Sequence, residues 1–182
     1  RANLGRGGLL MEKVLVVGNM KLDDVPKGTP GPTPPGPPNA IESVLTKFNK
    51  SEAAVWIAGS THPGEEKIIL ETFRVLNQDF PSLRLIIAPR HVERAGEVVS
   101  LVKEQGLTPQ LFSLAMKAGI NPDSVVVVDT IGHLRGLYRL ATVVFVGKSL
   151  VGEGGQNIIE PAFFAKPIVV GPNMQNFRSI MA

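Results

Sequence analysis

Residues 143–160 read VVFVGKSLVGEGGQNIIE, a short apolar run followed by a glycine-rich segment and then by a helix-like pattern. The run Val143–Val146 has no polar residue, which is typical of a parallel strand buried on both faces. Glycines just before a helix place backbone N–H groups where they can meet an anion. The stretch therefore predicts a strand, a ligand-binding loop and a helix of an α/β protein.

Similar apolar runs recur on both sides of this stretch, separated by segments with apolar residues at helical spacing. The helical segments cover residues 68–76, 98–102 and 134–141, and Glu65 and Glu66 lie where a helix dipole favours acidic side chains. The alternation predicts an α/β fold, a Rossmann-like doubly wound parallel sheet. The further predicted strands are Val14–Val17, Ala53–Ala58, Leu83–Ala88, Val125–Val128 and Ile168–Val170.

The composition fits one folded domain over residues 1–182, with 43% hydrophobic and 19% charged residues. No apolar run approaches the roughly 18 residues of a membrane-spanning helix. A net charge of +3 and the lack of a basic run with aromatic residues speak against a nucleic-acid partner. The absence of cysteine excludes disulfides and thiolate metal sites.

Two features stand apart from this domain pattern. Residues 26–38 contain seven of the fifteen prolines, which predicts a surface loop, either an insertion or a ligand for a proline-recognition module. The chain also starts at Arg1 instead of Met, so we expect it to be a piece of a longer protein.

In a doubly wound sheet, ligands bind at the carboxyl ends of the strands. The loops that leave the predicted strands carry small or polar residues, each with a structural and a functional interpretation. Arg90 could bind a phosphate or carboxylate, or pair with Glu93. Asp129 could orient a neighbouring loop, cap the next helix or bind a ribose hydroxyl. The candidate ligand-loop residues are Gly59, Ser60, Thr61, Pro89, Arg90, Ile131, Gly132, His133, Lys148, Ser149, Gly154 and Gly155.

Asn157 and Glu160 follow the glycines and share one face of the predicted helical turn. A carboxylate there suits the two hydroxyls of a ribose, while Asn157 and backbone N–H groups would hold a phosphate. Alternatively, the two residues form a capping box. The tract does not fit the G-x-G-x-x-G dinucleotide fingerprint, and three histidines without cysteine make a metal site unexpected.

Seven motifs occur in the order found in bacterial 3-deoxy-D-manno-octulosonic acid (Kdo) transferases, and the chain resembles that family. The resemblance covers nearly the whole chain apart from the first dozen residues and the proline-rich loop. The motifs are GNMKLD (18–23), AGSTHPGEE (58–66), APRHVER (88–94), DTIGHL (129–134), FVGKSL (145–150), GGQNIIEPA (154–162) and GPNMQNF (171–177).

The resemblance implies the C-terminal, donor-binding half of a GT-B glycosyltransferase. The donor would be CMP-Kdo and the acceptor a lipid A precursor, with no metal or other cofactor. The general base would be an acidic residue of an N-terminal domain that this chain lacks, so the chain alone would transfer nothing. By position in the motifs, the CMP-binding residues would be Pro89, Arg90, Ile131, Gly132, His133, Asn157, Ile158, Ile159 and Glu160.

The sequence departs from the family pattern at His133, where an acidic or amide residue is usual, and at Gln156, where histidine is common. The family works at the cytoplasmic face of the bacterial inner membrane, and membrane contact would involve the full-length protein only. Two alternatives remain from the residues themselves. One is another GT-B enzyme that uses a UDP-sugar, and the other is a non-catalytic nucleotide-binding module.

Overall fold

The computed structural model describes residues 53–181. The strand predicted at Val14–Val17 and the proline-rich loop 26–38 lie outside the described residues. The single domain over 1–182 stays a prediction, because residues 1–52 are not described. Within residues 53–181, no helix combines the length and apolar character needed to cross a membrane.

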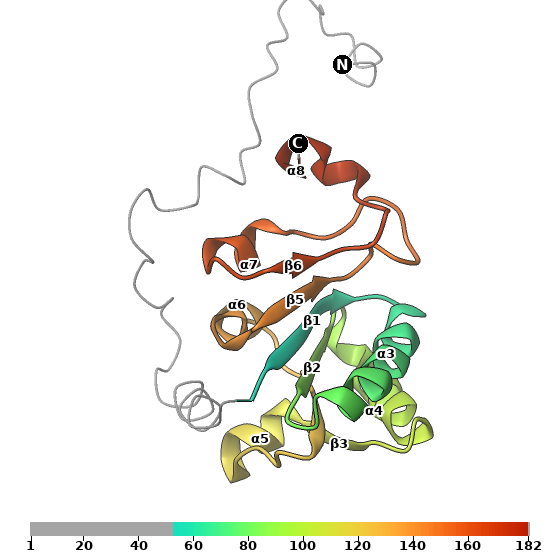
Figure 1. Ribbon diagram of the computed structural model, residues 1–182, viewed down its shortest axis with the longest axis vertical. Coiled ribbons are helices and arrows are strands. Elements are labelled where there is room, and N and C mark those ends of the chain that lie inside the picture. Colours follow the sequence, from blue (N-terminus) through green and yellow to red (C-terminus); the bar gives the residue numbers. More distant parts are fainter. Residues whose placement is uncertain (1–52, 182) are drawn as a thin grey trace, which may run out of the picture. The chain divides into compact units, whose positions relative to one another are not determined.

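The described residues form a six-stranded, all-parallel sheet in the order β3-β4-β2-β1-β5-β6 (Figure 1), and the predicted doubly wound α/β fold is confirmed. The strands are β1 (Val55–Thr61), β2 (Arg84–Pro89), β3 (Thr108–Leu111), β4 (Ser124–Val127), β5 (Val143–Val146) and β6 (Ile168–Val169). The helices are α3 (Glu65–Asp79), η3 (Val92–Arg94), α4 (Ala95–Glu104), α5 (Phe112–Ala118), α6 (Leu134–Leu137), η4 (Tyr138–Leu140), α7 (Ile159–Phe163), η5 (Gln175–Phe177) and α8 (Arg178–Met181).

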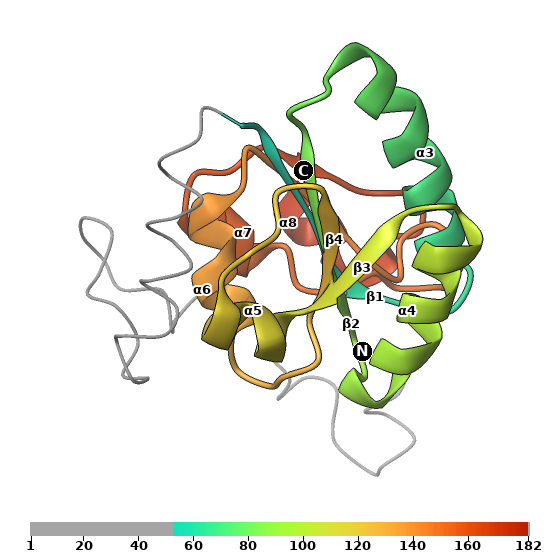
Figure 2. The same cartoon turned by 90° about the horizontal axis from the view of Figure 1, so that it is seen from below.

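Helices cover both faces of the sheet, which explains why its central strands are largely apolar. Successive side chains of a strand point to opposite faces. Val55 and Ile57 of β1 therefore belong to the core cluster that includes residues of α5 and α6, while Trp56 and Ala58 belong to the cluster of α3 and α4. Figure 2 shows the two groups of helices on either side of the sheet.

The chain changes direction across the sheet between β4 and β5, because β5 pairs with β1 on the side opposite β2. The connection after β1 runs through α3 on one face, and the connection after β5 runs through α7 on the other. Such a switch point separates the outgoing loops, and ligands of doubly wound sheets usually bind there. Residues 62–64 and 147–158 leave β1 and β5 at this point.

The sequence pattern did not predict β3 or α5. β3 has the polar sequence TPQL and lies at the edge of the sheet, where Pro109 is tolerated because an edge strand need not donate every N–H. α5 has only seven residues and buries two of them, Phe112 and Ala115. Neither element carries the long apolar run or the repeated helical spacing that marks the others.

Candidate functional site

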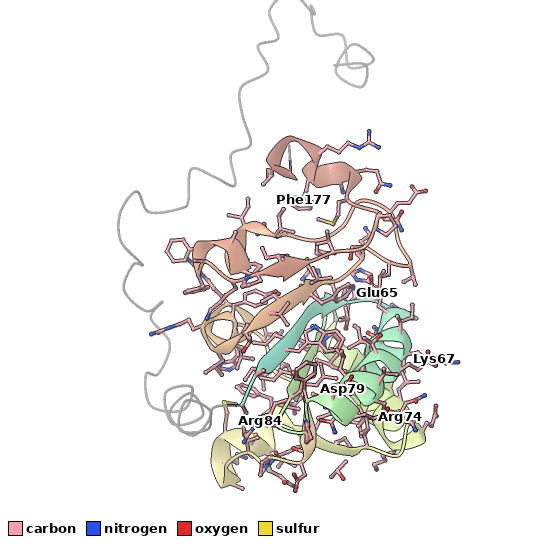
Figure 3. All side chains as sticks on the ribbon, viewed as in Figure 1. Glu65, Lys67, Arg74, Asp79, Arg84 and Phe177 are labelled. Atoms are coloured by element: carbon pink, nitrogen blue, oxygen red, sulfur yellow. The ribbon has the colours of Figure 1, made fainter. Side chains whose placement is uncertain are left out.

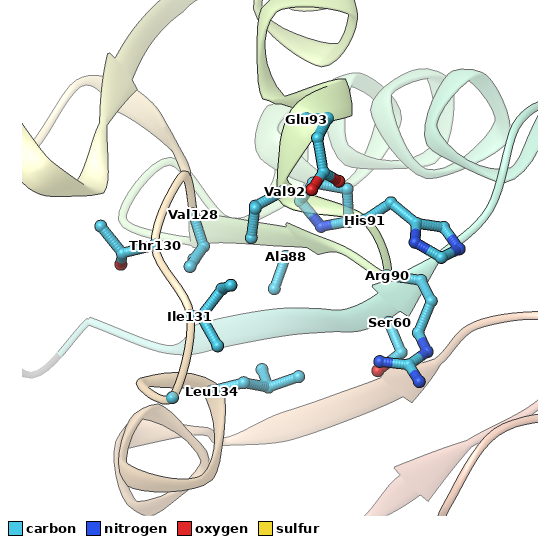
Figure 4. Close-up of a pocket in the computed structure, with 12 residues that line it drawn as sticks. Ser60, Ala88, Arg90, His91, Val92, Glu93, Val128, Thr130, Ile131 and Leu134 are labelled. Atoms are coloured by element: carbon cyan, nitrogen blue, oxygen red, sulfur yellow. The ribbon is translucent and has the colours of Figure 1, made fainter.

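A pocket of about 270 Å³ lies at the carboxyl ends of β1, β2 and β4 (Figure 4). It brings together side chains from three loops that are distant in sequence. In Figure 4, Ser60 and Arg90 lie on one side of the pocket, and Thr130 and Ile131 lie on the other. The predicted residues among those that line it are Ser60, Pro89, Arg90, Ile131 and Gly132.

Arg90 supplies a positive charge at the pocket wall. Its backbone N–H donates to the Thr61 carbonyl at 2.9 Å, which fixes the end of β2 against the end of β1. Its side chain is exposed and extends toward Ser60 in Figure 4. Among residues 53–181 the Arg90 guanidinium forms no ion pair, so the alternative pairing with Glu93 does not occur. Arg90 is therefore available to an anionic ligand.

Arg94, four residues after Arg90, is by contrast already paired with acidic side chains. Its guanidinium pairs with the buried Glu66 at 2.7 Å and with Glu97 at 2.9 Å, and Glu66 also accepts from the Thr61 hydroxyl at 2.9 Å. The hydrogen bond to Glu97 raises the pKa of Arg94, and the same bond lowers the pKa of Glu97. This network ties α3 to the segment after β2.

The loop after β4 presents Ile131 to solvent, with 81% of the residue exposed, and Gly132 adopts a positive φ of 86°. Asp129 holds the start of α5, because its carboxylate accepts from the Ser113 N–H at 2.9 Å and the Ser113 hydroxyl at 2.5 Å. The interpretation of Asp129 as a cap of the next helix is thus wrong, because its carboxylate binds the start of the preceding helix α5, and α6 has no side-chain cap. His133 packs its ring 5.5 Å from that of Phe112.

The glycine-rich segment differs from the prediction. The Gly154 N–H donates to Gln175 Oε1 at 2.8 Å, and the Gly155 N–H donates to the Lys148 carbonyl at 3.2 Å. These two N–H groups are used inside the protein, so the prediction that they point into the cleft is wrong. Ser149 is also an internal residue, because its buried hydroxyl donates to the Val146 carbonyl at 2.6 Å and accepts from the Gly171 N–H at 2.9 Å.

The Asn157 side-chain oxygen accepts from the N–H of Ile159, the first residue of α7, at 3.0 Å, and the N-cap residue of that helix is Ile158. The N–H groups of residues 156–158 have no hydrogen-bond partner among residues 53–181. Glu160 follows in the first turn of α7 and lies close enough to Tyr138 to contribute, after burial, to the raised pKa of that phenol. Residues 157–160 do not line the pocket described above.

Three polar residues have roles that the sequence pattern did not show. Thr130 lines the pocket with a buried hydroxyl that has no partner in residues 53–181. Tyr138 is buried with its hydroxyl against Gly59. Glu65, predicted only as a helix-start acid, is completely buried and accepts backbone hydrogen bonds from the loop after β5. No group of three or more metal-ligating side chains occurs in the part of the chain that the structure describes.

Gly59 and Tyr138 provide a test of how tightly β1 packs against the Tyr138 side chain. A Cβ at position 59 would overlap the Tyr138 hydroxyl and lie 3.0 Å from Tyr138 Cζ. We expect Gly59→Ala to lower the free energy of unfolding by about 1–3 kcal/mol, the range for overpacked cores. Adding Tyr138→Phe removes the hydroxyl and should recover part of that loss, which urea denaturation of the two single variants and the double variant would measure. If the effects of the two substitutions on the free energy of unfolding were additive, they would contradict the contact between position 59 and the Tyr138 hydroxyl.

The fold and the site define a class. The chain is a Rossmann-like α/β domain with a pocket at the carboxyl ends of its parallel strands. No family model matches the chain. The C-terminal CMP-Kdo binding domain of WaaA from Acinetobacter baumannii, a solved structure, is 33% identical with a TM-score of 0.70. That match covers 78% of this chain and 73% of the solved one.

Two curated relatives match 95% of the chain. A 3-deoxy-D-manno-octulosonic acid transferase of Haemophilus influenzae is 34% identical over 180 residues, and a bifunctional glycosyltransferase/methyltransferase of Fusobacterium nucleatum is 35% identical over 176 residues. The chain belongs to the 3-deoxy-D-manno-octulosonic acid transferase family, which confirms the resemblance seen in the sequence. It spans 38% of the Haemophilus protein and 26% of the Fusobacterium protein.

Proposed function

We propose that this chain binds CMP-Kdo and is the donor-binding half of an enzyme that transfers Kdo to a lipid A precursor. The observation that carries the proposal is the convergence of Arg90 with Ile131 and Gly132 on one pocket. The family resemblance implies that each of these residues contacts CMP. Arg90 lies some forty residues from the other two, so their meeting depends on the fold.

CMP would extend from the pocket to the start of α7, since residues 157–160 do not line the pocket itself. The cytosine would lie between the loops at Pro89 and Ile131, where apolar side chains and exposed backbone are available. The ribose would meet Glu160, and the phosphate would meet Arg90 together with the unpaired N–H groups of residues 156–158. Because the N–H groups of Gly154 and Gly155 are occupied, they have no part in this arrangement.

The chemistry that these groups can support is electrostatic. When the acceptor hydroxyl attacks the anomeric carbon of Kdo, the bond to CMP breaks and the phosphate takes up negative charge. Arg90 and N–H donors can stabilise that charge as CMP leaves. A donor with a single phosphate needs no metal ion to hold it, and we propose none. The proton of the attacking hydroxyl would go to a base in an N-terminal domain, so we expect this chain alone to bind donor weakly and transfer nothing.

The biological setting follows from the same proposal. Kdo transfer to a lipid A precursor belongs to lipopolysaccharide assembly at the cytoplasmic face of the inner membrane. Contact with the membrane and with the acceptor would then involve the full-length protein. This domain would bind the nucleotide sugar. No nucleic acid is needed as a partner.

Calorimetric titration of this chain with CMP, UMP and UDP tests the proposal. We expect CMP to bind at least tenfold more tightly than UMP, because the two differ only in the base that the pocket reads. UDP tests the alternative of a UDP-sugar enzyme, since a second phosphate would add affinity only in a site built for a diphosphate. Preference for UDP over CMP would overturn the proposal in favour of that alternative, and binding of none would overturn both.

A further inference from the structure

The Glu65 carboxylate accepts four backbone hydrogen bonds and is completely buried at the start of α3 (Figure 3). Oε2 accepts from the N–H groups of His62 at 2.9 Å and Lys148 at 2.8 Å. Oε1 accepts from those of Ser149 and Leu150, each at 3.0 Å. Three of the four donors are consecutive residues of the loop after β5, here named the 148–150 loop.

Three successive N–H groups that converge on one point form a concavity suited to an anion. Lys148 makes the convergence possible by adopting a positive φ of 57°, which a residue with a side chain rarely takes up. The concavity lies at the switch point between β1 and β5, where ligands of doubly wound sheets usually bind. Here the protein fills it with its own carboxylate, so it is closed to a ligand phosphate.

The 148–150 loop in turn holds the segments around it. The Lys148 carbonyl accepts from the Gly155 N–H at 3.2 Å, and the Ser149 carbonyl accepts from the Asn173 N–H at 3.0 Å. The Asn173 side chain donates to the Leu150 carbonyl at 3.1 Å. Gly155 is two residues before Asn157, so the position of the α7 start depends on this loop.

We propose that Glu65 is a positioning residue of the donor site, which acts by holding the 148–150 loop and, through it, the start of α7. The carboxylate touches no ligand itself. Its loss would release the loop, shift residues 156–160 and weaken nucleotide binding. This inference rests on the proposed function, since it assumes that residues 156–160 contact CMP.

Glu65→Gln is the sharpest variant because it keeps the size of the side chain and changes only its hydrogen-bonding pattern. Each carboxylate oxygen accepts from two N–H groups, so the amide NH₂ would face two donors whichever way it turned. Glu66→Gln is the matched control. Glu66 is the next residue and equally buried, but it binds Thr61 and Arg94 and not the 148–150 loop.

We expect both variants to unfold at lower temperature than the wild type. Only Glu65→Gln should lose CMP affinity, by tenfold or more. The affinities are measured by calorimetry well below the unfolding transition. Glu66→Gln should stay within about threefold of the wild type. Amide hydrogen exchange at residues 148–150 should be slow in the wild type and fast in Glu65→Gln alone. If Glu65→Gln does not fold, Glu65→Asp keeps the charge but is one methylene too short to span both sets of donors, and the same loss of affinity is expected.

The outcomes separate this inference from the proposed function. A wild-type chain that binds CMP, together with Glu65→Gln or Glu65→Asp that binds it equally well, overturns the positioning role and leaves the function standing. Equal losses of CMP affinity in Glu65→Gln and Glu66→Gln would also overturn the positioning role, because they would indicate general destabilisation of the fold. A wild-type chain that does not bind CMP refutes the function and with it the role of Glu65 in donor binding. Fast amide hydrogen exchange at residues 148–150 in the wild type would show that Glu65 does not hold the 148–150 loop, and would refute the inference.

Discussion

Gly147→Ala is expected to destabilise the domain by about 3 kcal/mol or more, the largest stability effect that we predict. Gly147 follows β5 and its N–H donates to the Gly59 carbonyl of β1 at 2.8 Å. A Cβ there would overlap the Ser60 carbonyl oxygen and lie 2.7 Å from Thr61 Cα. These are backbone atoms of the central strand, which cannot turn aside as a side chain would.

Gly96→Ala is the control for this change. Gly96 lies in the first turn of α4, and a Cβ there would meet no atom within 4 Å. Alanine in a helix is favoured over glycine by roughly 0.5–1 kcal/mol, so this variant should be slightly more stable than the wild type. Urea denaturation followed by circular dichroism measures both. A Gly147→Ala protein with wild-type stability would show that β1 and β5 do not approach as described.

Glu160→Ala is expected to weaken CMP binding by about 1.5–3 kcal/mol, which corresponds to roughly tenfold to 150-fold in affinity. The reason is the loss of a charged hydrogen-bond acceptor for the ribose hydroxyls. Because the ribose is also present in cytidine, Glu160→Ala should weaken cytidine and CMP alike. Arg90→Ala should weaken CMP but not cytidine, since the guanidinium is proposed to meet the phosphate.

Titration calorimetry of the two variants with both ligands gives this pattern directly. Glu71→Ala serves as the control, because it removes an exposed carboxylate from the middle of α3 and should leave both affinities unchanged. A Glu160→Ala variant that bound CMP like the wild type would place the ribose elsewhere. Loss of cytidine affinity in Arg90→Ala would mean that Arg90 contacts the nucleoside instead of the phosphate.

The sheet was largely predictable because burial on both faces makes each central strand apolar throughout. The same argument fails at the edge, where β3 contains Pro109 and has a polar sequence. The pocket was predictable in part because strand-end loops of a parallel sheet meet at one edge. Ser60, Arg90 and Ile131 line it for that reason.

What could not be predicted depends on partners far away in the sequence. The prediction for Gly154 and Gly155 assumed free N–H groups, but Gln175 Oε1 and the Lys148 carbonyl already accept from them. Glu65 has the pattern of an ordinary helix-start acid, yet three of its four donors lie 83 to 85 residues away. A local pattern contains no information about such partners until the fold brings them together.

The pairing of β1 with β5 also has a consequence for how the protein is made. The Val55 N–H donates to the Thr142 hydroxyl, 87 residues further along, so the centre of the sheet joins segments that a ribosome releases at quite different times. Contacts of such long sequence separation form slowly. Until β5 is synthesised, one edge of β1 has no neighbour, and Glu65 lacks three of its donors. Nascent chains that stall before residue 143 should therefore expose an apolar strand edge and depend on chaperones to avoid aggregation.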